Sequence, residues 1–345
     1  MTTDSTPTLP KSEILFLYES KYSLPNGDPF TNEQRYDEET KQILVSDVRI
    51  KRFIRDYLYE AGHKIFVIPA KPVEGEARQS DSDTVTDVAE SGAAQRFEEL
   101  KRDSPSGISN EEVLLQCIDA RLFGAVVTIK GTAQRRRGRN APAADDGGAS
   151  RPITKTGPVQ FALLNPSLNR IDLRPHQNTS RFVSRVGKGQ GAIATTSLVP
   201  YALNQIHGWI DPYSARETNL TQKDIDLMFR ALWESVNSAN TRSKSNQDSL
   251  LLLQIVYKEP HKKIYGVDSL ITLKPNDKQE EQIRRFSDYT LDFSALLKAV
   301  ESDRVAQVNF YTEDEGLTET FKDQKKFNPI LFYPDDNSKQ EDDKA

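Results

Sequence analysis

The stretch DVRIKRFIRDYLY, residues 47–59, predicts an amphipathic α-helix. Its apolar residues recur at i, i+3, i+4, i+7 and i+8, a spacing that gathers them on one side of a helix. They are Ile50, Phe53, Ile54, Tyr57 and Leu58. Ser46 and Asp47 offer an N-cap, and Gly62 ends the helix.

The rest of this predicted helix is basic, with few acids among the bases. Arg49 lies on the flank, and opposite the apolar residues lie Lys51, Arg52 and Arg55. Such a face has two interpretations. It is either an ordinary solvated surface or a surface that binds phosphates, to which a guanidinium group donates two hydrogen bonds at once.

Outward from this helix, strands and helices alternate along the chain. Residues 13–20 (EILFLYES) are apolar and β-prone, and the turn signal PNGDP follows at residues 25–29. Further strands are expected at residues 64–68, 122–130, 159–164, 197–210, 250–257 and 304–311. Further helices are expected at residues 95–101, 109–120, 221–236 and 293–300. The interleaving predicts an α+β fold with a compact sheet core and protruding loops.

Several segments flank or interrupt this core, which spans residues 13–311. Residues 1–12 are expected to be a flexible N-terminus. Three insertions are expected, an acidic one at about residues 70–107, a mobile basic loop at 131–156, and a polar, glycine-punctuated stretch at 174–194. Residues 312–345 form an acidic C-terminal extension whose last ten residues should be disordered.

The formal net charge of −5 conceals a basic region. Residues 71–100 and 312–345 together carry a net −10, so the remainder carries +5, and residues 121–190 alone carry +10. Because nucleic-acid binding draws on clustered Lys and Arg, the total charge does not argue against such a partner.

Cysteine and histidine usage excludes several classes of site. The single cysteine, Cys117, permits neither a disulfide framework nor a cysteine-based zinc site, and the four histidines lie far apart in sequence. No metal or other cofactor is therefore expected. Since no run of 18 apolar residues and no signal-peptide pattern is present, we expect a soluble, cytoplasmic protein.

Three further segments are candidates for contact with RNA. A loop between glycines holds Arg135, Arg136, Arg137 and Arg139. The polar stretch holds Arg174, Arg181, Arg185, Lys188 and Gln190; its Gly-Lys-Gly-Gln-Gly run lacks the spacing of a P-loop and better fits a hairpin turn near nucleic acid. The loop after the helix at 221–236 holds Asn240, Arg242, Ser243 and Lys244. A solubilising patch or a plain helix-ending loop explains the same residues.

Signals for catalysis are weak. The chain has no His-Glu-x-x-His and no Gly-x-Ser-x-Gly. Asp28, Asp37 and Asp47 could support acid-base or metal chemistry, but turn and cap roles already explain Asp28 and Asp47.

Five collinear segments together resemble the backbone subunit of type I CRISPR effector (Cascade) complexes, the Cas-seven family, and most closely its type I-B branch. They are YSLPNGDP at residues 22–29, SDVRIKRFIRDYL at 46–58, DARLFGAV at 119–126, GPVQFALLNPSL at 157–168, and the loop at 238–244. Together they span most of the expected core.

The resemblance implies a modified RNA-recognition-motif (ferredoxin-like) palm with a fingers insertion and a thumb hairpin, the thumb lying within residues 174–194. It implies a non-catalytic subunit that polymerises along CRISPR RNA and holds its backbone, leaving target DNA to be read by base pairing. The implied partners are CRISPR RNA, target DNA through the guide, further copies in a filament, and Cas-five, Cas-six and Cas-eight type subunits. The implied RNA contacts include Lys21 and the basic residues of the 47–59 helix.

Two departures from the family pattern keep other interpretations open. The Asn-Gly-Asp theme of the first loop occurs once rather than twice, and no matched pair of base-stacking aromatic residues is evident. Type III relatives cut target RNA with an aspartate in this loop. An endoribonuclease using Asp28 or Asp37 is therefore the alternative, and a lone, nonspecific RNA binder is a third.

Overall fold

The computed structural model describes residues 9–28, 30–31, 33–68, 85–129, 151–179, 193–241 and 243–333. The fold is mixed α+β, as the sequence predicts. The chain divides into two units. The first comprises Met1–Tyr57, Val159–Pro212 and Asp226–Ala345, and the second comprises Leu58–Pro158 and Tyr213–Ile225.

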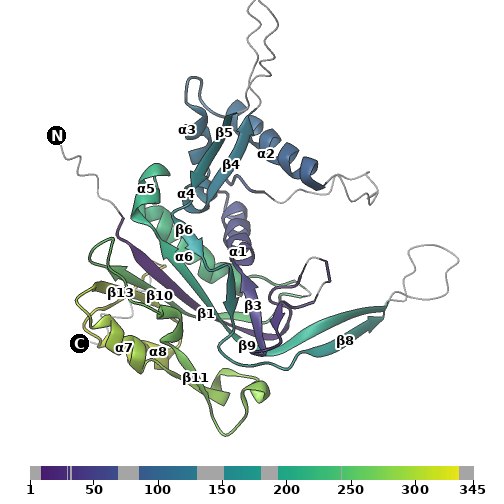
Figure 1. Cartoon of the computed structure of the whole chain (residues 1–345), viewed down its shortest axis with the longest axis vertical. Coiled ribbons are helices and arrows are strands. Elements are labelled where there is room, and N and C mark those ends of the chain that lie inside the picture. Colours follow the sequence, from purple (N-terminus) through teal and green to yellow (C-terminus); the bar gives the residue numbers. More distant parts are fainter. Residues whose placement is uncertain are drawn as a thin grey trace, which may run out of the picture. The chain divides into compact units, whose positions relative to one another are not determined.

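The first unit is built on a seven-stranded sheet (Figure 1). Its strands follow the order β14-β13-β10-β1-β9-β6, and β8 pairs with β9 outside this path. Only β13 and β14 run parallel; the other pairs are antiparallel. The bounds are β1 Ser12–Ser23, β6 Val159–Phe161, β8 Arg174–Thr179, β9 Ile193–Ile210, β10 Gln247–Tyr257, β13 Val305–Tyr311 and β14 Phe327–Pro329.

The central strand β1 is covered on both faces, which explains its nearly continuous apolar run. Leu15 and Leu17 belong to a core cluster that includes Leu296. The alternate residue Phe16 lies on the other face, where its ring centroid is 6.3 Å from that of Trp233. A strand buried on both faces makes β1 a rigid base for the residues at its two ends.

Helices and short strands complete the first unit. The helices are α1 Asp47–Glu60, α6 Gln222–Asn237, α7 Ser294–Val300 and α8 Glu315–Lys322, with 3₁₀ turns at η1 Val267–Ser269, η2 Glu280–Gln282 and η3 Phe286–Asp288. A small sheet joins β2 Tyr36–Asp37, β3 Gln42–Ser46 and β7 Leu164–Pro166, and a hairpin joins β11 Thr272–Pro275 to β12 Tyr289–Asp292. Figure 1 shows β8 and the start of β9, residues 193–198, projecting from the sheet as a two-stranded arm.

The second unit has its own core of buried residues, among them Phe66, Phe97, Leu100 and Leu114. Its elements are α2 Val85–Arg102, α3 Asn110–Leu115, α4 Ile118–Phe123, β4 Gly124–Ile129 and β5 Arg151–Thr156, and α5 Pro212–Glu217 leads back into it. Across the described residues of both units, no helix is long and apolar enough to cross a membrane.

The expected strand at residues 64–68 is wrong. The backbone N–H groups of Phe66 and Val67 donate to the two carboxylate oxygens of Asp119, at 2.7 and 3.0 Å, instead of to a neighbouring strand. Asp119 is fully buried, so its side chain takes the place of a strand partner. An apolar run alone does not reveal such a partner.

The expected single helix at residues 109–120 is two helices. Ser109 caps α3 in a capping box with Glu112. The first helix, α3, ends at Leu115. The guanidinium of Arg121 donates to the carbonyl oxygens of Leu115 and Gln116. These bonds satisfy carbonyl groups that the break leaves free.

The predicted loop at residues 131–156 is wrong over its last six residues. Arg151–Thr156 forms β5, which pairs with β4 along its whole length. Its polar sequence RPITKT lacks apolar alternation, and the strand forms because β4 offers a complete hydrogen-bonding edge. Residues 131–150 lie outside the described residues.

Other boundaries also shift. The expected strand at 159–164 is divided into β6 and β7, because the side-chain amide of Asn165 donates to the carbonyl oxygens of Val45 and Ala162 and turns the chain. The acidic extension is not wholly separate, since α8 and β14 lie within residues 312–345 and β14 joins the sheet. Residues 334–345 lie outside the described residues.

Candidate nucleic-acid interface

The predicted basic helix is present as α1. The hydroxyl of Ser46 accepts a hydrogen bond from the backbone N–H of Arg49 at 3.4 Å, which caps the first turn. Ile50, Phe53, Ile54 and Leu58 are at most 4% exposed. The helix and its buried face are therefore confirmed.

The bases on α1 have different surroundings. Nζ of Lys51 donates to the carboxylate of Asp47 and to Oε1 of Gln160, both at 3.1 Å. Nε of Arg52 lies 2.6 Å from both carboxylate oxygens of Asp56 on the surface. Arg55 is partly buried. The positive charges of Lys51 and Arg52 are thus partly neutralised within the helix.

Arg49 differs, because no carboxylate forms an ion pair with it in the described part of the chain. Its guanidinium carbon lies 3.7 Å from the ring centroid of Phe53, in cation–π distance. Its Nε is buried without a hydrogen-bond partner among the described residues. Burial lowers the pKa of Arg49, but a guanidinium group keeps its charge at physiological pH. Its buried Nε is therefore a hydrogen-bond donor without an acceptor among the described residues.

Lys244 lies close enough to Arg49 for their charges to interact, although the two residues are far apart in sequence. Burial, and then the positive charge of Arg49, lower the pKa of Lys244 to about 8. Its Nζ donates to the carbonyl oxygen of Leu24, and no described carboxylate pairs with it. Two partly buried cations therefore lie close together, an arrangement that is unfavourable in the free protein and that a bound anion would relieve.

Backbone contacts fix the loop that carries Lys244. The N–H of Leu24 donates to the carbonyl of Ser243 at 2.8 Å, and the N–H of Lys21 donates to the carbonyl of Asn246 at 2.9 Å. The amide of Gln247 donates to the carbonyl of Lys244 at 2.7 Å. The loop is thereby attached to the end of β1, which presets the position of the lysine.

A buried tyrosine adds a third polar group to this region. Tyr18 is fully buried on β1, its hydroxyl has no partner among the described residues, and burial raises its pKa. The charge of Arg49 opposes that increase, so the two groups lie near each other. We call Tyr18, Arg49 and Lys244 the cation pocket.

Lys21 does not join the cation pocket. Its Nζ pairs with Glu19 at 2.8 Å and with Asp248 at 3.1 Å. Glu19 in turn accepts from the hydroxyl of Tyr201, on the face of β1 opposite Tyr18. Lys21 is thus held by two acids. It contributes to the region through its backbone N–H, which bonds to the carbonyl of Asn246, and not through its charge.

The other predicted RNA contacts are more dispersed. Arg174 is exposed on β8 of the projecting arm, Asn240 is exposed after α6, and Ser243 contributes its carbonyl to the loop contact. The remaining candidates lie outside the described residues; they are Arg135, Arg136, Arg137, Arg139, Arg181, Arg185, Lys188, Gln190 and Arg242.

The two candidate catalytic aspartates shape turns. The carboxylate of Asp28 accepts from the N–H groups of Phe30 at 2.9 Å and Thr31 at 3.4 Å, and it pairs with Arg35 at 3.2 Å. Hydrogen bonds also hold the pKa of Asp37 below its usual value, and its carboxylate accepts from the N–H of Glu39 at 3.0 Å. Both side chains therefore have local structural roles.

Sequence reasoning missed two residues. Tyr18 lies within an apolar run, and the sequence does not distinguish a tyrosine with an unpartnered hydroxyl from an ordinary core residue. Tyr22 has φ 47° and is 57% exposed, a strained conformation for a bulky residue. It lies in the quoted YSLPNGDP segment, but strain is not visible in a sequence.

Comparisons with known proteins agree with the resemblance found in the sequence. The family described as CRISPR-associated protein Cas7 matches residues 10–294. A CRISPR-associated protein Cas7 from Haloferax volcanii is 28% identical over 305 residues, covering 86% of this chain and 85% of the relative. A chain of a CRISPR RNA-guided surveillance complex, pre-nicking, has a TM-score of 0.45 and 13% identity over 88% of this chain and 93% of its own. A chain of a CRISPR RNA-guided surveillance complex has a TM-score of 0.45 and 12% identity over 88% of this chain and 90% of its own.

Proposed function

Since this chain belongs to the CRISPR-associated protein Cas7 family, we propose that it binds CRISPR RNA as a repeating backbone subunit and that its cation pocket holds a phosphate of that RNA. The observation that carries the proposal is the pair Arg49 and Lys244, two partly buried cations that lie together without a carboxylate partner among the described residues. A phosphodiester supplies the missing negative charge and accepts hydrogen bonds from both groups.

The chemistry of the pocket favours the RNA backbone over its bases. A guanidinium and an ammonium group recognise charge and oxygen geometry, which all nucleotides share. A subunit that holds the backbone leaves the bases free to pair with target DNA. We propose the same partners as the sequence implies, namely the guide, target DNA through it, further copies of the chain and other Cascade subunits.

Parts of the fold are assigned roles within this proposal. The sheet with α1 and α6 is the RNA-recognition-motif-like palm, and the arm of β8 and β9 is the thumb. Arg174 on this arm is then a second backbone contact. The bases on α1 other than Arg49 are weaker contacts, because Lys51 and Arg52 already have acidic partners.

We propose that the subunit is not an endoribonuclease. The oxygens of Asp28 and Asp37 accept backbone hydrogen bonds that shape their turns, so neither side chain is free to act on a phosphate without loss of local structure. Incubation of the assembled complex with complementary RNA and Mg²⁺ tests this directly. Guide-directed cleavage that disappears in Asp28→Ala or Asp37→Ala would overturn the non-catalytic assignment.

The pocket itself is tested by the salt dependence of RNA binding. We compare the wild-type chain with an Arg49→Ala, Lys244→Gln double variant on a guide-length single-stranded RNA. If each residue contacts one phosphate, the slope of log K against log salt falls in magnitude by about 1.4. The matched control is Lys274→Gln, which removes a surface lysine paired with Asp292 at 2.5 Å on the β11–β12 hairpin. An unchanged slope in the double variant would reject the pocket as a phosphate site.

Assembly is tested separately by native mass measurements on RNAs of increasing length. A backbone subunit adds copies in steps as the RNA lengthens. A lone nonspecific binder binds without such regular steps, so a mass distribution with no fixed nucleotide interval per copy would contradict the repeating role.

A further inference from the structure

The end of the sheet opposite the cation pocket displays an aromatic ring among cations. This end surface comprises Lys258, Lys262, Lys263, Tyr265, Arg304 and Lys325. The segment 258–266 follows β10 directly, and it reads KEPHKKIYG. Neither the resemblance to the family nor the cation pocket accounts for it.

The segment is held firmly in place. The hydroxyl of Tyr257 accepts from the N–H of Ile264 at 3.1 Å, and Ile264 itself is only 9% exposed. The guanidinium of Arg304 donates to the carbonyl of Lys263 at 3.2 Å, and the N–H of Lys258 donates to the carbonyl of Arg304 at 3.0 Å. These contacts fix the backbone before Tyr265, and after it the N–H of Ser269 donates to the carbonyl of Gly266 at 3.0 Å.

Tyr265 is displayed rather than packed. Tyr265 is 75% exposed, although in sequence it lies between the buried residues Ile264 and Val267. Gly266, with φ 65°, turns the chain in the left-handed region so that the ring stays outside while its neighbours enter the core. Nζ of Lys263 lies 5.2 Å from the ring centroid. A rigidly mounted ring with a cation beside it offers a stacking surface.

Positive charge exceeds negative charge around this ring. Lys262 pairs with Glu259 at 3.0 Å, and the exposed His261 also lies near Glu259, at 3.4 Å. Burial and the positive charges of Lys258 and Lys325 lower the pKa of Lys326, while Asp303 and Glu301 oppose this. The surface and its surroundings therefore hold six Lys or Arg and three acids, the acids being Glu259, Glu301 and Asp303.

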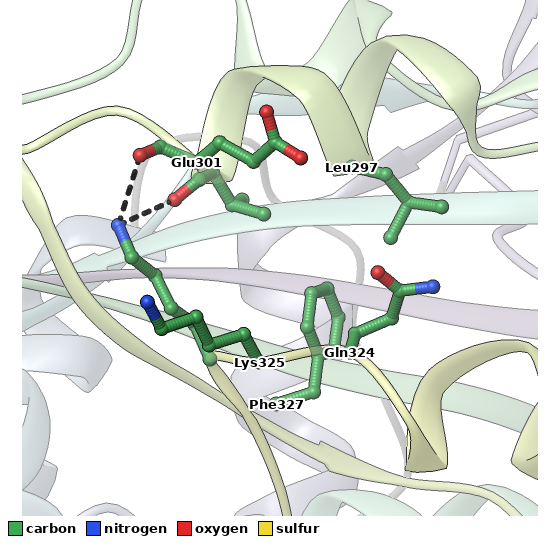
Figure 2. Close-up of a pocket in the computed structure, with 7 residues that line it drawn as sticks. Leu297, Glu301, Gln324, Lys325 and Phe327 are labelled. Carbon is green, nitrogen blue, oxygen red and sulfur yellow. Dashed lines mark hydrogen bonds between the residues drawn. The ribbon is translucent and has the colours of Figure 1, made fainter.

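Lys325 extends the surface to a neighbouring hollow. Together with Leu297, Glu301, Gln324 and Phe327 it lines a pocket of about 300 Å³ (Figure 2). The adjacent Lys326 is not available for a ligand, because its Nζ donates to the carbonyl oxygens of Val300 at 2.9 Å and Glu301 at 3.2 Å, among others, at the end of α7. Lys325 makes no such contact in the described residues and contributes a free charge.

The end surface and the cation pocket lie at opposite ends of β1. Ser12 pairs with Val256, next to the end surface, whereas the N–H of Lys21 bonds to Asn246, next to Lys244. The ten residues from Ser12 to Lys21, nine steps along the strand, span roughly 30 Å. One nucleotide cannot occupy both places.

We propose that the end surface binds single-stranded nucleic acid, with one base stacked on Tyr265 and its phosphates held by Lys258, Lys263 and Arg304. An acidic peptide would use the cations alone, but a base uses the exposed ring as well. The proposal does not depend on the function assigned to the cation pocket.

The test measures binding of a labelled oligothymidine, with oligouridine as the RNA counterpart, to the full chain already saturated with guide-length RNA. Tyr265→Ala should weaken oligothymidine binding at least fivefold, and Tyr265→Phe should retain it, because the ring and not the hydroxyl stacks. Tyr213→Ala, which removes another exposed tyrosine, is the matched control and should leave binding unchanged. Loading of the guide RNA should be the same in all three variants.

Three results would overturn the proposal. The first is equal binding by Tyr265→Ala and the wild-type chain, and the second is equal loss in Tyr265→Phe and Tyr265→Ala. The third combines three observations: the double variant Lys258→Gln, Lys263→Gln loses oligothymidine binding, Tyr265→Ala has no effect, and polyglutamate competes fully. This combination would indicate an acidic protein partner. Preference for oligothymidine or oligouridine then identifies DNA or RNA as the ligand.

Discussion

Replacement of Lys244 by Met should stabilise the free protein and weaken its binding to RNA. The side chain keeps its length but loses its charge and its hydrogen bond to Leu24. In the folded chain the pKa of Lys244 is about 8, against an ordinary value of 10.5. At 1.36 kcal/mol per pKa unit this difference is about 3 kcal/mol, and about 2 kcal/mol remains once solvent screening and the lost hydrogen bond are allowed for.

The effect has a defined pH window. Below pH 8 both the folded and the unfolded chain hold the proton, and the folded state carries the full cost of the buried charge. Between pH 8 and 10.5 the unfolded chain holds a proton that the folded chain has released, so the stability of the wild-type chain rises with pH. The advantage of Lys244→Met should therefore be largest at pH 7 and decrease toward pH 10.

Urea unfolding of both chains at pH 7, 8 and 9 measures this difference. RNA binding provides the second readout, because a phosphate beside Lys244 favours the protonated amine. Wild-type affinity should fall as the pH rises above 8, and that dependence should be absent in Lys244→Met. If the variant is less stable than the wild-type chain at pH 7, or if its RNA affinity keeps the same pH dependence, the reasoning about two crowded cations is wrong.

Three further predictions concern single positions. Tyr22→Gly should raise the melting temperature, by relief of about 1 kcal/mol of backbone strain at φ 47°, and a thermal melt that shows a decrease would contradict this. Asp119→Ala should lower stability by about 2 to 5 kcal/mol, because the buried N–H of Phe66 and the partly buried N–H of Val67 lose their acceptor; urea unfolding measures the loss. Gly157→Ala should lower stability by about 3 kcal/mol or more, since a Cβ would lie 2.0 Å from the carbonyl carbon of Phe123. Gly92→Ala, where a Cβ meets nothing within 4 Å, is its matched control and should be neutral or stabilising in the same assay.

The sequence predicted the main elements because their signals are local. The 3.6-residue period of α1 and the apolar run of β1 both have the expected type and nearly the expected bounds. The predictions of a loop at β5 and of a strand at Phe66 were wrong for the same reason, because each structure depends on a partner far away in sequence. Local pattern does not encode such partners.

The candidate site shows the same limit. Arg49 and Lys244 were both predicted to contact RNA, each from its own neighbourhood in the sequence. That they lie together follows only from the pairing of β1 with β10, which brings the loop before β10 to the end of β1. Likewise, Lys51 and Arg52 looked equivalent to Arg49 until their pairs with Asp47 and Asp56 distinguished them.

The outer strands carry a consequence for assembly. A strand at the rim of a sheet presents unpaired backbone groups to which another chain can add itself, and repeated addition leads to uncontrolled fibres. Here β5, β7, β8 and β14 each contain a proline, which has no N–H to offer; these are Pro152, Pro166, Pro175 and Pro329. In the assembly proposed above, neighbouring copies would therefore meet at these strands through side chains and bound RNA, and not by growth of the sheet.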